Sequence, residues 1–128
     1  MIYLDTSVAL AQLLAEDRRP PAELWAETLV SSRLLEYELW VRLHARGLAA
    51  THGESARTLL SGLAFVELVP QVLRRALEPF ERPVRTLDAL HLASAFFLAD
   101  QGHDLQVASY DGRLLEAAAS LGLSPALS

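Results

Sequence analysis

Two hydrophobic periodicities alternate along the chain, one typical of buried strands and the other of helices. Short apolar runs bounded by turn-forming residues predict strands at residues 2–4, 64–69, 105–109 and 123–127, with a short strand or turn at 30–32. Apolar residues that recur every three or four positions predict helices at residues 7–16, 22–29, 33–46, 53–63, 70–77, 86–102 and 112–122. This alternation indicates an α/β fold with a parallel or mostly parallel sheet.

Several predicted helix ends are marked by residues with special backbone preferences. Pro70 suits the first turn of a helix, where a missing N–H costs nothing. Ser31 or Ser32 is expected to cap the helix at residues 33–46, and Gly47 is expected to end it. Ligands of a parallel sheet bind at the carboxyl ends of its strands, so we expect the chemistry there.

The composition is that of a compact globular chain. Its 128 residues are 52% hydrophobic and 21% charged, which suits one domain spanning residues 1–128. There is no cysteine, which excludes disulfides and thiolate metal sites. No apolar run approaches the length of a transmembrane helix, and the first residues show no signal-peptide pattern. We therefore expect a cytoplasmic protein with no membrane segment.

The charged residues exclude some mechanisms but not a nucleic-acid substrate. All 11 basic residues are arginines, so no mechanism that needs a lysine is available. The formal net charge of −5 does not resemble the basic footprint of a nucleic-acid binder. However, a site of four carboxylates would leave a remainder of about −1 (−5 + 4), and a bound divalent metal would offset the site itself. Net charge therefore neither supports nor excludes a nucleic-acid substrate.

Three aspartates lie where this fold could bring them together. Asp5 and Asp111 each follow a predicted strand and precede a helix. Asp88 lies two residues after Thr86, a plausible N-cap, in the first turn of a strongly apolar helix. Each could simply cap or stabilise its helix. If the strands before Asp5 and Asp111 are neighbours, the three carboxylates can instead converge, and such an oxygen-only cluster favours Mg²⁺ or Mn²⁺.

The helix at residues 33–46 offers a fourth carboxylate, from either Glu36 or Glu38. Positions two apart on a helix point in nearly opposite directions, so at most one of them can face a given site. Helical neighbour spacing would also allow Glu36 to pair with Arg33, and Glu38 with Arg42. Periodicity alone does not choose between the two glutamates.

His91 lies one turn after Asp88 and can face the same way. It could be a metal ligand. A histidine on an apolar helix more often packs or hydrogen-bonds within the core, and that is the interpretation we expect for His91.

Four segments of the chain resemble the PIN-domain family, and within it the VapC-type toxin ribonucleases. "MIYLDTSVAL" is similar to the opening strand of the family with its first aspartate, Asp5. "SSRLLEYELWVRL" is similar to the segment with the acidic helix residue, which falls on Glu38. "RTLDALHLASA" is the most specific match and places the third acid at Asp88. "VASYDGRLLEAAASLGLSPAL" places the fourth at Asp111, with Ser109 where family members often have threonine. The resemblance extends over nearly the whole chain.

The resemblance implies a PIN-like fold of three layers, α/β/α, with a mostly parallel central sheet. It implies hydrolysis of RNA phosphodiester bonds that depends on Mg²⁺ or Mn²⁺, usually by a homodimer that a small antitoxin protein holds inactive. Its metal and catalytic residues would be Asp5, Glu38, Asp88 and Asp111. Asp5 and Asp88 would be the most direct ligands. Thr6 and Ser109 could hydrogen-bond the carboxylates, and arginines that the sequence does not specify would hold the RNA.

Four other interpretations compete with a toxin nuclease. A phospho-acceptor receiver fold also places acids at strand ends, but it needs a lysine. A haloacid-dehalogenase-type phosphatase needs a second aspartate two residues after Asp5, where Ser7 stands. A non-catalytic PIN-like interaction module, whose acids are only caps, and a housekeeping PIN nuclease without an antitoxin are the alternatives that the sequence leaves open.

Overall fold

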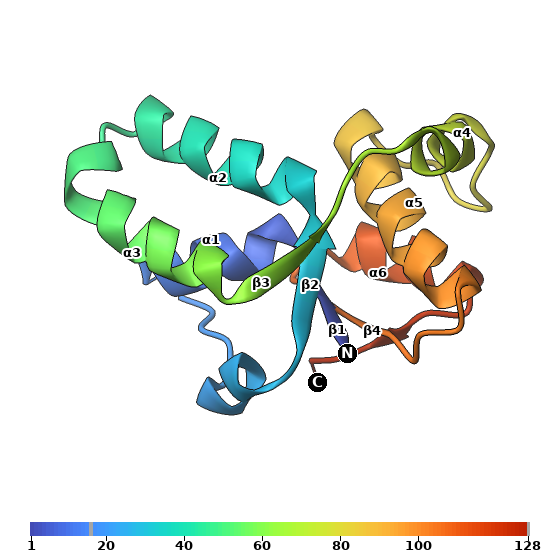
Figure 1. The fold of residues 1–128 in the computed structure, drawn as a ribbon, viewed down its shortest axis with the longest axis horizontal. Coiled ribbons are helices and arrows are strands. Elements are labelled where there is room, and N and C mark those ends of the chain that lie inside the picture. The colour runs from blue at the N-terminus through green and yellow to red at the C-terminus, as the bar shows by residue number, and fades with distance from the viewer. Residues whose placement is uncertain (16, 128) are drawn as a thin grey trace.

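Five parallel strands form the central sheet within the residues that the computed structural model describes, 1–15 and 17–127 (Figure 1). In chain order they are β1 (Ile2–Leu4), β2 (Leu29–Ser32), β3 (Leu63–Val66), β4 (Gln106–Ala108) and β5 (Ser124–Pro125). Their order across the sheet is β3-β2-β1-β4-β5, so β1 is the middle strand. The predicted α/β fold with a mostly parallel sheet is confirmed.

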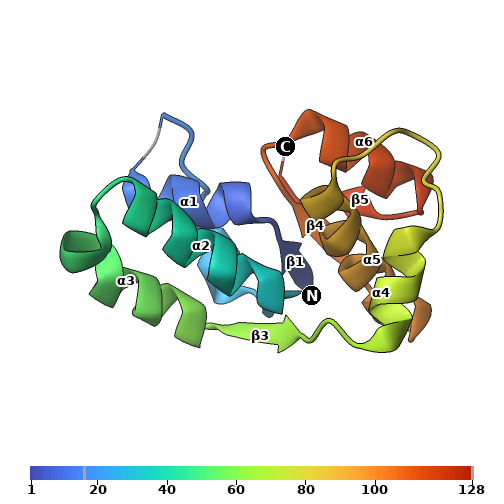
Figure 2. The ribbon, with the colours of Figure 1, turned by 90° about the horizontal axis from the view of Figure 1, so that it is seen from above.

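Helices cover both faces of this sheet, which is therefore the middle of three layers (Figure 2). One face carries α1 (Thr6–Leu14), α2 (Arg33–Ala45) and α3 (Ala49–Ser61). The other carries α4 (Pro70–Leu77), α5 (Thr86–Asp100) and α6 (Gly112–Ser120). A short 3-10 helix, η1 (Ala22–Ala26), precedes β2. Among the described helices, none is both long and apolar enough to cross a lipid bilayer.

Alternate side chains of the middle strand enter two separate hydrophobic cores. Ile2 and Leu4 pack with residues of α1, α2 and α3, whereas Tyr3 packs with residues of α5 and α6. Successive residues of a strand point to opposite faces of its sheet. A parallel sheet covered on both faces therefore needs uninterrupted apolar strands, which explains why all three residues of β1 are buried.

The pairing of β1 with β4 brings two predicted site residues side by side. The strands run parallel, with Leu4 opposite Ala108. Asp5 follows Leu4 directly, and its backbone N–H donates to the carbonyl of Ala108 (2.9 Å). Asp111 lies three residues after the same alanine. The strands that precede the two aspartates are neighbours, which is the arrangement that a shared site requires.

The helix predicted at residues 22–29 is wrong in its second half. Only the turn of η1 forms, and Leu29 opens β2, where it pairs with Ile2 on one side and Leu63 on the other. Leu29 is buried between two strands. This burial outweighs the local helical periodicity, because strand formation depends on neighbours distant in sequence.

The two serines that end β2 have different partners. Ser31 Oγ donates to the carbonyl of Leu4 in the neighbouring strand (2.7 Å). Ser32 Oγ accepts from the backbone N–H of Leu34 (3.1 Å), so Ser32 is the cap of α2. Gly47, whose φ is +67°, lies just beyond the end of that helix, in the left-handed conformation that glycine adopts readily.

Several predicted ends shift by a few residues. α1 ends at Leu14, and Glu16, the last residue of the helix predicted at 7–16, lies outside the described residues. α3 begins at Ala49 and so is longer than the helix predicted at 53–63. Three strands are shorter than the segments predicted at 64–69, 105–109 and 123–127.

Candidate active site

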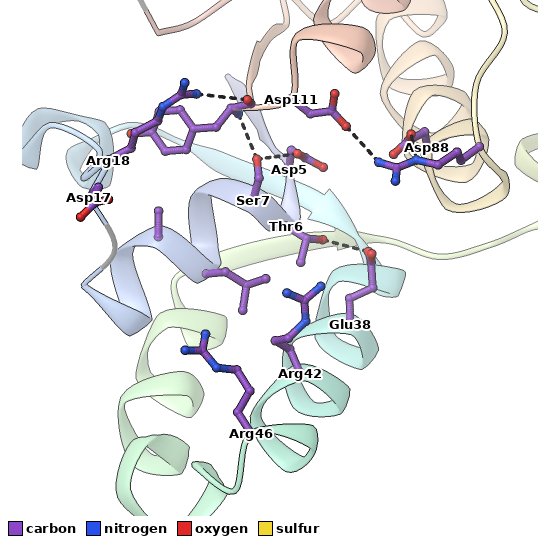
Figure 3. A pocket seen from close by; sticks show the side chains of 14 residues that line it. Asp5, Thr6, Ser7, Asp17, Arg18, Glu38, Arg42, Arg46, Asp88 and Asp111 are labelled. Atoms are coloured by element: carbon purple, nitrogen blue, oxygen red, sulfur yellow. Dashed lines mark hydrogen bonds and ion pairs between the residues drawn. The ribbon is translucent and has the colours of Figure 1, made fainter.

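The four acids predicted from the sequence line one open pocket at the carboxyl ends of β1 and β4 (Figure 3). They are Asp5, Glu38, Asp88 and Asp111. They come from the β1–α1 turn, from α2, from the first turn of α5 and from the β4–α6 turn. Asp17, an exposed acid, also lines this pocket, which we call the acidic pocket.

Hydroxyl groups hold the buried carboxylate of Asp5. Its Oδ2 accepts from Ser7 Oγ (2.7 Å) and from Ser109 Oγ (2.8 Å). Ser109 Oγ accepts in turn from the backbone N–H of Asp111 (2.9 Å). Asp5 occupies the N-cap position of α1, but its side chain makes no capping hydrogen bond. Asp5 is therefore not a simple helix cap, and the hydrogen bond expected from Ser109 is present.

The two oxygens of Asp111 have different partners. Oδ1 caps α6 by accepting from the backbone N–H groups of Arg113 (3.0 Å) and Leu114 (3.3 Å). Oδ2 faces the acidic pocket and lies 3.5 Å from Nη2 of Arg85. Asp111 is thus a helix cap through one oxygen and a pocket residue through the other.

The Asp88 carboxylate is costly to ionise in the folded chain. Its side chain is 17% exposed, in the first turn of α5. Burial raises its pKa above the usual range, and the nearby carboxylates of Asp111 and Asp5 add to that rise. A hydrogen bond from Arg85 Nε (3.3 Å) acts in the opposite direction. The N-cap of α5 is Arg85 and not Thr86, so the cap expected from the sequence is wrong.

The structure distinguishes Glu38 from Glu36, between which periodicity could not choose. Glu36 pairs with Arg33 (2.7 Å) and does not line the acidic pocket. Glu38 lines the pocket, and its Oε1 accepts from the Thr6 hydroxyl (2.8 Å). In the part of the chain that the structure describes, Glu38 forms no ion pair with Arg42. The carboxylate of Glu38 is thus held by neutral Thr6 rather than by a helical neighbour.

A buried chain of hydrogen bonds reaches the same oxygen of Glu38 from the core. The backbone N–H of Ser32 donates to the Tyr3 hydroxyl oxygen (3.2 Å). The Tyr3 hydroxyl lies 2.7 Å from His91 Nδ1, and His91 Nε2 lies 2.5 Å from Glu38 Oε1. We call this series the Tyr3–His91–Glu38 chain.

The directions of these hydrogen bonds follow from the groups at the two ends. An ionised carboxylate can only accept, so we assign the proton of the imidazole to Nε2, which donates to Glu38. Burial raises the pKa of the Tyr3 phenol far above its usual range, so the phenol keeps its proton and donates to Nδ1 of His91. Both nitrogens of His91 are engaged, which confirms the expectation of a hydrogen-bonded core residue.

Comparison with known proteins places this pocket in a family. The sequence matches the family model of the PIN domain over residues 2–120. The chain belongs to the PIN domain family. Ribonuclease VapC46 of Mycobacterium tuberculosis is 35% identical over 129 residues, which cover 96% of this chain and 94% of the relative. Ribonucleases VapC47 and VapC35 of the same organism are 33% and 30% identical, covering 95% and 97% of this chain and 93% and 94% of the relatives. The resemblance predicted from the sequence is confirmed.

The donor set of this PIN domain suits a hard divalent cation, although the ligands are not yet gathered around one point. Four carboxylates with no thiolate are the oxygen donors that Mg²⁺ and Mn²⁺ favour. Within residues 1–15 and 17–127, no three acidic or histidine side chains are grouped closely enough to hold a metal ion. Arg85 lies between Asp88 and Asp111 and offsets part of their charge.

Three residues that contact the site in this PIN domain were not identified from the sequence. Ser7 lies two residues after Asp5, a spacing at which hydroxyl and carboxylate side chains commonly interact in turns. Arg85 precedes Asp88 by three residues, which is a helical neighbour spacing. Tyr3 carries no such local signal, because its partner His91 is 88 residues away in the chain.

Proposed function

We propose that this PIN domain, spanning residues 1–128, is a metal-dependent endoribonuclease that hydrolyses RNA phosphodiester bonds. The observation that carries the proposal is the gathering of four carboxylates in one pocket at the carboxyl ends of neighbouring parallel strands. The similarity to ribonucleases along almost the whole chain supports RNA as the substrate. The oxygen-only donor set supports Mg²⁺, or alternatively Mn²⁺, as the cofactor.

Each acid has a part in this proposal. Asp5 and Asp88 would hold the metal most directly, and Glu38 and Asp111 would complete its shell, directly or through water. When bound, the metal would act as a Lewis acid that polarises the phosphate and lowers the pKa of the attacking water. Glu38 would orient that water through Oε2, because Oε1 already accepts from Thr6 and His91.

We also propose that the protein is the toxin of a toxin–antitoxin pair, acting in the cytoplasm as a homodimer that a small antitoxin protein inhibits. The similarity to VapC ribonucleases supports this role. Exposed apolar side chains offer surface for protein contacts. They include Tyr37 and Val41 on α2, Leu73 and Leu77 on α4, and Leu87 on α5.

The decisive experiment compares single-stranded RNA cleavage by the wild type and by the Asp5→Asn and Asp88→Asn variants, with Mg²⁺ and with EDTA. Both variants should be folded and inactive, and EDTA should stop the wild type. Asp100→Asn is the matched control, because it changes an exposed acid on α5 outside the pocket. It should cleave normally. Cleavage by both pocket variants would favour a non-catalytic PIN-like module whose acids serve the fold.

The antitoxin part of the proposal has a separate test. If a short open reading frame lies next to this gene, it is co-expressed with the protein. Its product should bind the protein and stop RNA cleavage. A gene with no such neighbour, together with an active and harmless enzyme in cells, would favour the housekeeping nuclease instead.

A further inference from the structure

Helix α2 presents one acid and two arginines to the acidic pocket in a single row. Glu38, Arg42 and Arg46 follow one another at four-residue intervals, which places them on the same face of a helix. All three line the pocket, and Figure 3 shows the two arginines reaching toward it from successive turns. Four residues of helix rise by about 6 Å, so the row leads away from the acids in steps of that size.

The other arginines of the acidic pocket already have partners. Arg85 pairs with Asp88 and Asp111. Arg18 donates to the carbonyl of Tyr110 (3.3 Å), and its guanidinium lies over the ring of the same tyrosine.

Arg42 and Arg46 differ from them, because both are exposed and neither forms an ion pair within the described residues. Within the described residues, the positive charges of Arg42 and Arg46 are therefore available to bind an anion.

The row could serve only the stability of α2. Arg42 lies in the last turn and Arg46 at the C-cap, where a positive charge interacts favourably with the helix dipole. The same explanation applies to Arg74, an exposed arginine in the last turn of α4. Arg74, however, does not line the acidic pocket. This difference in position separates a helix-stabilising role from a ligand-binding one.

We propose that Arg42 and Arg46 bind successive phosphates of single-stranded RNA and hold the strand along α2, on one side of the bond that is cut. The inference rests on the proposed nuclease function and adds where the substrate lies. The carboxylates of the pocket repel an RNA backbone, and an adjacent pair of cations would attract it. Arginine suits this contact because its planar guanidinium can donate two hydrogen bonds to one phosphate.

The test measures RNA binding rather than cleavage. A fluorescent single-stranded RNA of mixed sequence is titrated with the Asp5→Asn protein in EDTA, at salt concentrations from low to physiological. Each lost phosphate contact reduces the slope of log K against log salt by about 0.7 for a single strand. Arg42→Gln and Arg46→Gln should each lower the slope by about that amount, and the double variant by about twice as much. Arg74→Gln is the matched control and should leave the slope unchanged.

Two results would overturn the inference. One is an unchanged slope in the double variant, and the other is an equal loss in Arg74→Gln, which would mean a general charge effect. Neither of these results bears on the nuclease proposal, which fails instead if the Asp5→Asn and Asp88→Asn variants still cleave RNA.

Discussion

The two halves of the acidic pocket are held in different ways. Asp5 and Glu38 are fixed by hydrogen bonds from the hydroxyls of Ser7, Ser109 and Thr6 and from the imidazole of His91. Asp88 and Asp111 instead face the side chain of Arg85, which is 77% exposed. Buried, well-paired hydrogen bonds fix a group in place, whereas exposed ion pairs contribute little and are easily exchanged. The first half is therefore preorganised, and the second half is adjustable.

Among the residues that hold the four acids, His91 should give the largest effect, because it supports the preorganised half. His91→Leu removes the Nε2–H donor to Glu38 and puts an apolar side chain of similar size in its place in the core. Loss of a group that orients a metal-site residue typically costs about 10–100-fold in metal affinity or activity. Mn²⁺ binding by calorimetry should weaken by that order, together with RNA cleavage. Exposed His103 is the control position, and His103→Leu should bind Mn²⁺ normally.

A smaller effect is expected at Ser109, because Asp5 would keep one of its two hydroxyl donors. Ser109→Ala removes the 2.8 Å hydrogen bond to Oδ2. Hydrogen bonds to charged groups contribute about 1.5–3 kcal/mol. The lower end of this range fits a carboxylate that keeps its hydrogen bond from Ser7, and it corresponds to cleavage slower by about tenfold. Ser109→Thr keeps the hydroxyl and should restore most of the activity in the same assay. If the threonine variant were as poor as the alanine variant, packing rather than the hydroxyl would be the cause.

In the half formed by Asp88 and Asp111, removing a partner should strengthen metal binding instead of weakening it. Arg85→Gln removes the positive charge that would compete with a metal ion for Asp88 and Asp111. Because exposed ion pairs are worth about 0–1 kcal/mol, Mn²⁺ affinity should rise by no more than about fivefold. Weaker Mn²⁺ binding in this variant, measured by calorimetry, would mean that Arg85 supports the metal site instead of competing with it. Arg82→Gln, in the same loop but outside the pocket, is the control.

The smallest expected effect is on the thermal stability of the metal-free protein. The pKa of Asp88 is raised above its ordinary value of 3.8, so its ionisation begins to destabilise the fold as the pH rises above 3.8, and the full cost is reached above the raised pKa. Asp88→Asn should therefore melt a few degrees higher than the wild type in EDTA near pH 7. The difference should shrink as the pH falls and vanish below about 3.8, where Asp88 is protonated in both states. A constant difference at every pH would contradict this origin.

Local patterns along the chain were enough to predict much of the fold. Apolar runs and helical spacing predicted the parallel α/β arrangement, with Asp5 and Asp111 at the ends of strands. They did so because the period of buried side chains is a property of neighbouring residues. Among the predicted elements, the clear failure is the helix at residues 22–29, where Leu29 is buried by two other strands. The family resemblance added Glu38, which spacing alone could not separate from Glu36.

By itself, then, the sequence determined which elements form and which acids lie at their ends, because both depend on residues close together in the chain. Only the tertiary structure decided how those acids are held. The partners of Glu38, Thr6 and His91, lie 32 and 53 residues away from it. Arg85 and Asp111 are 26 residues apart. Contacts between such distant residues depend on how helices and strands pack, and no local periodicity encodes them.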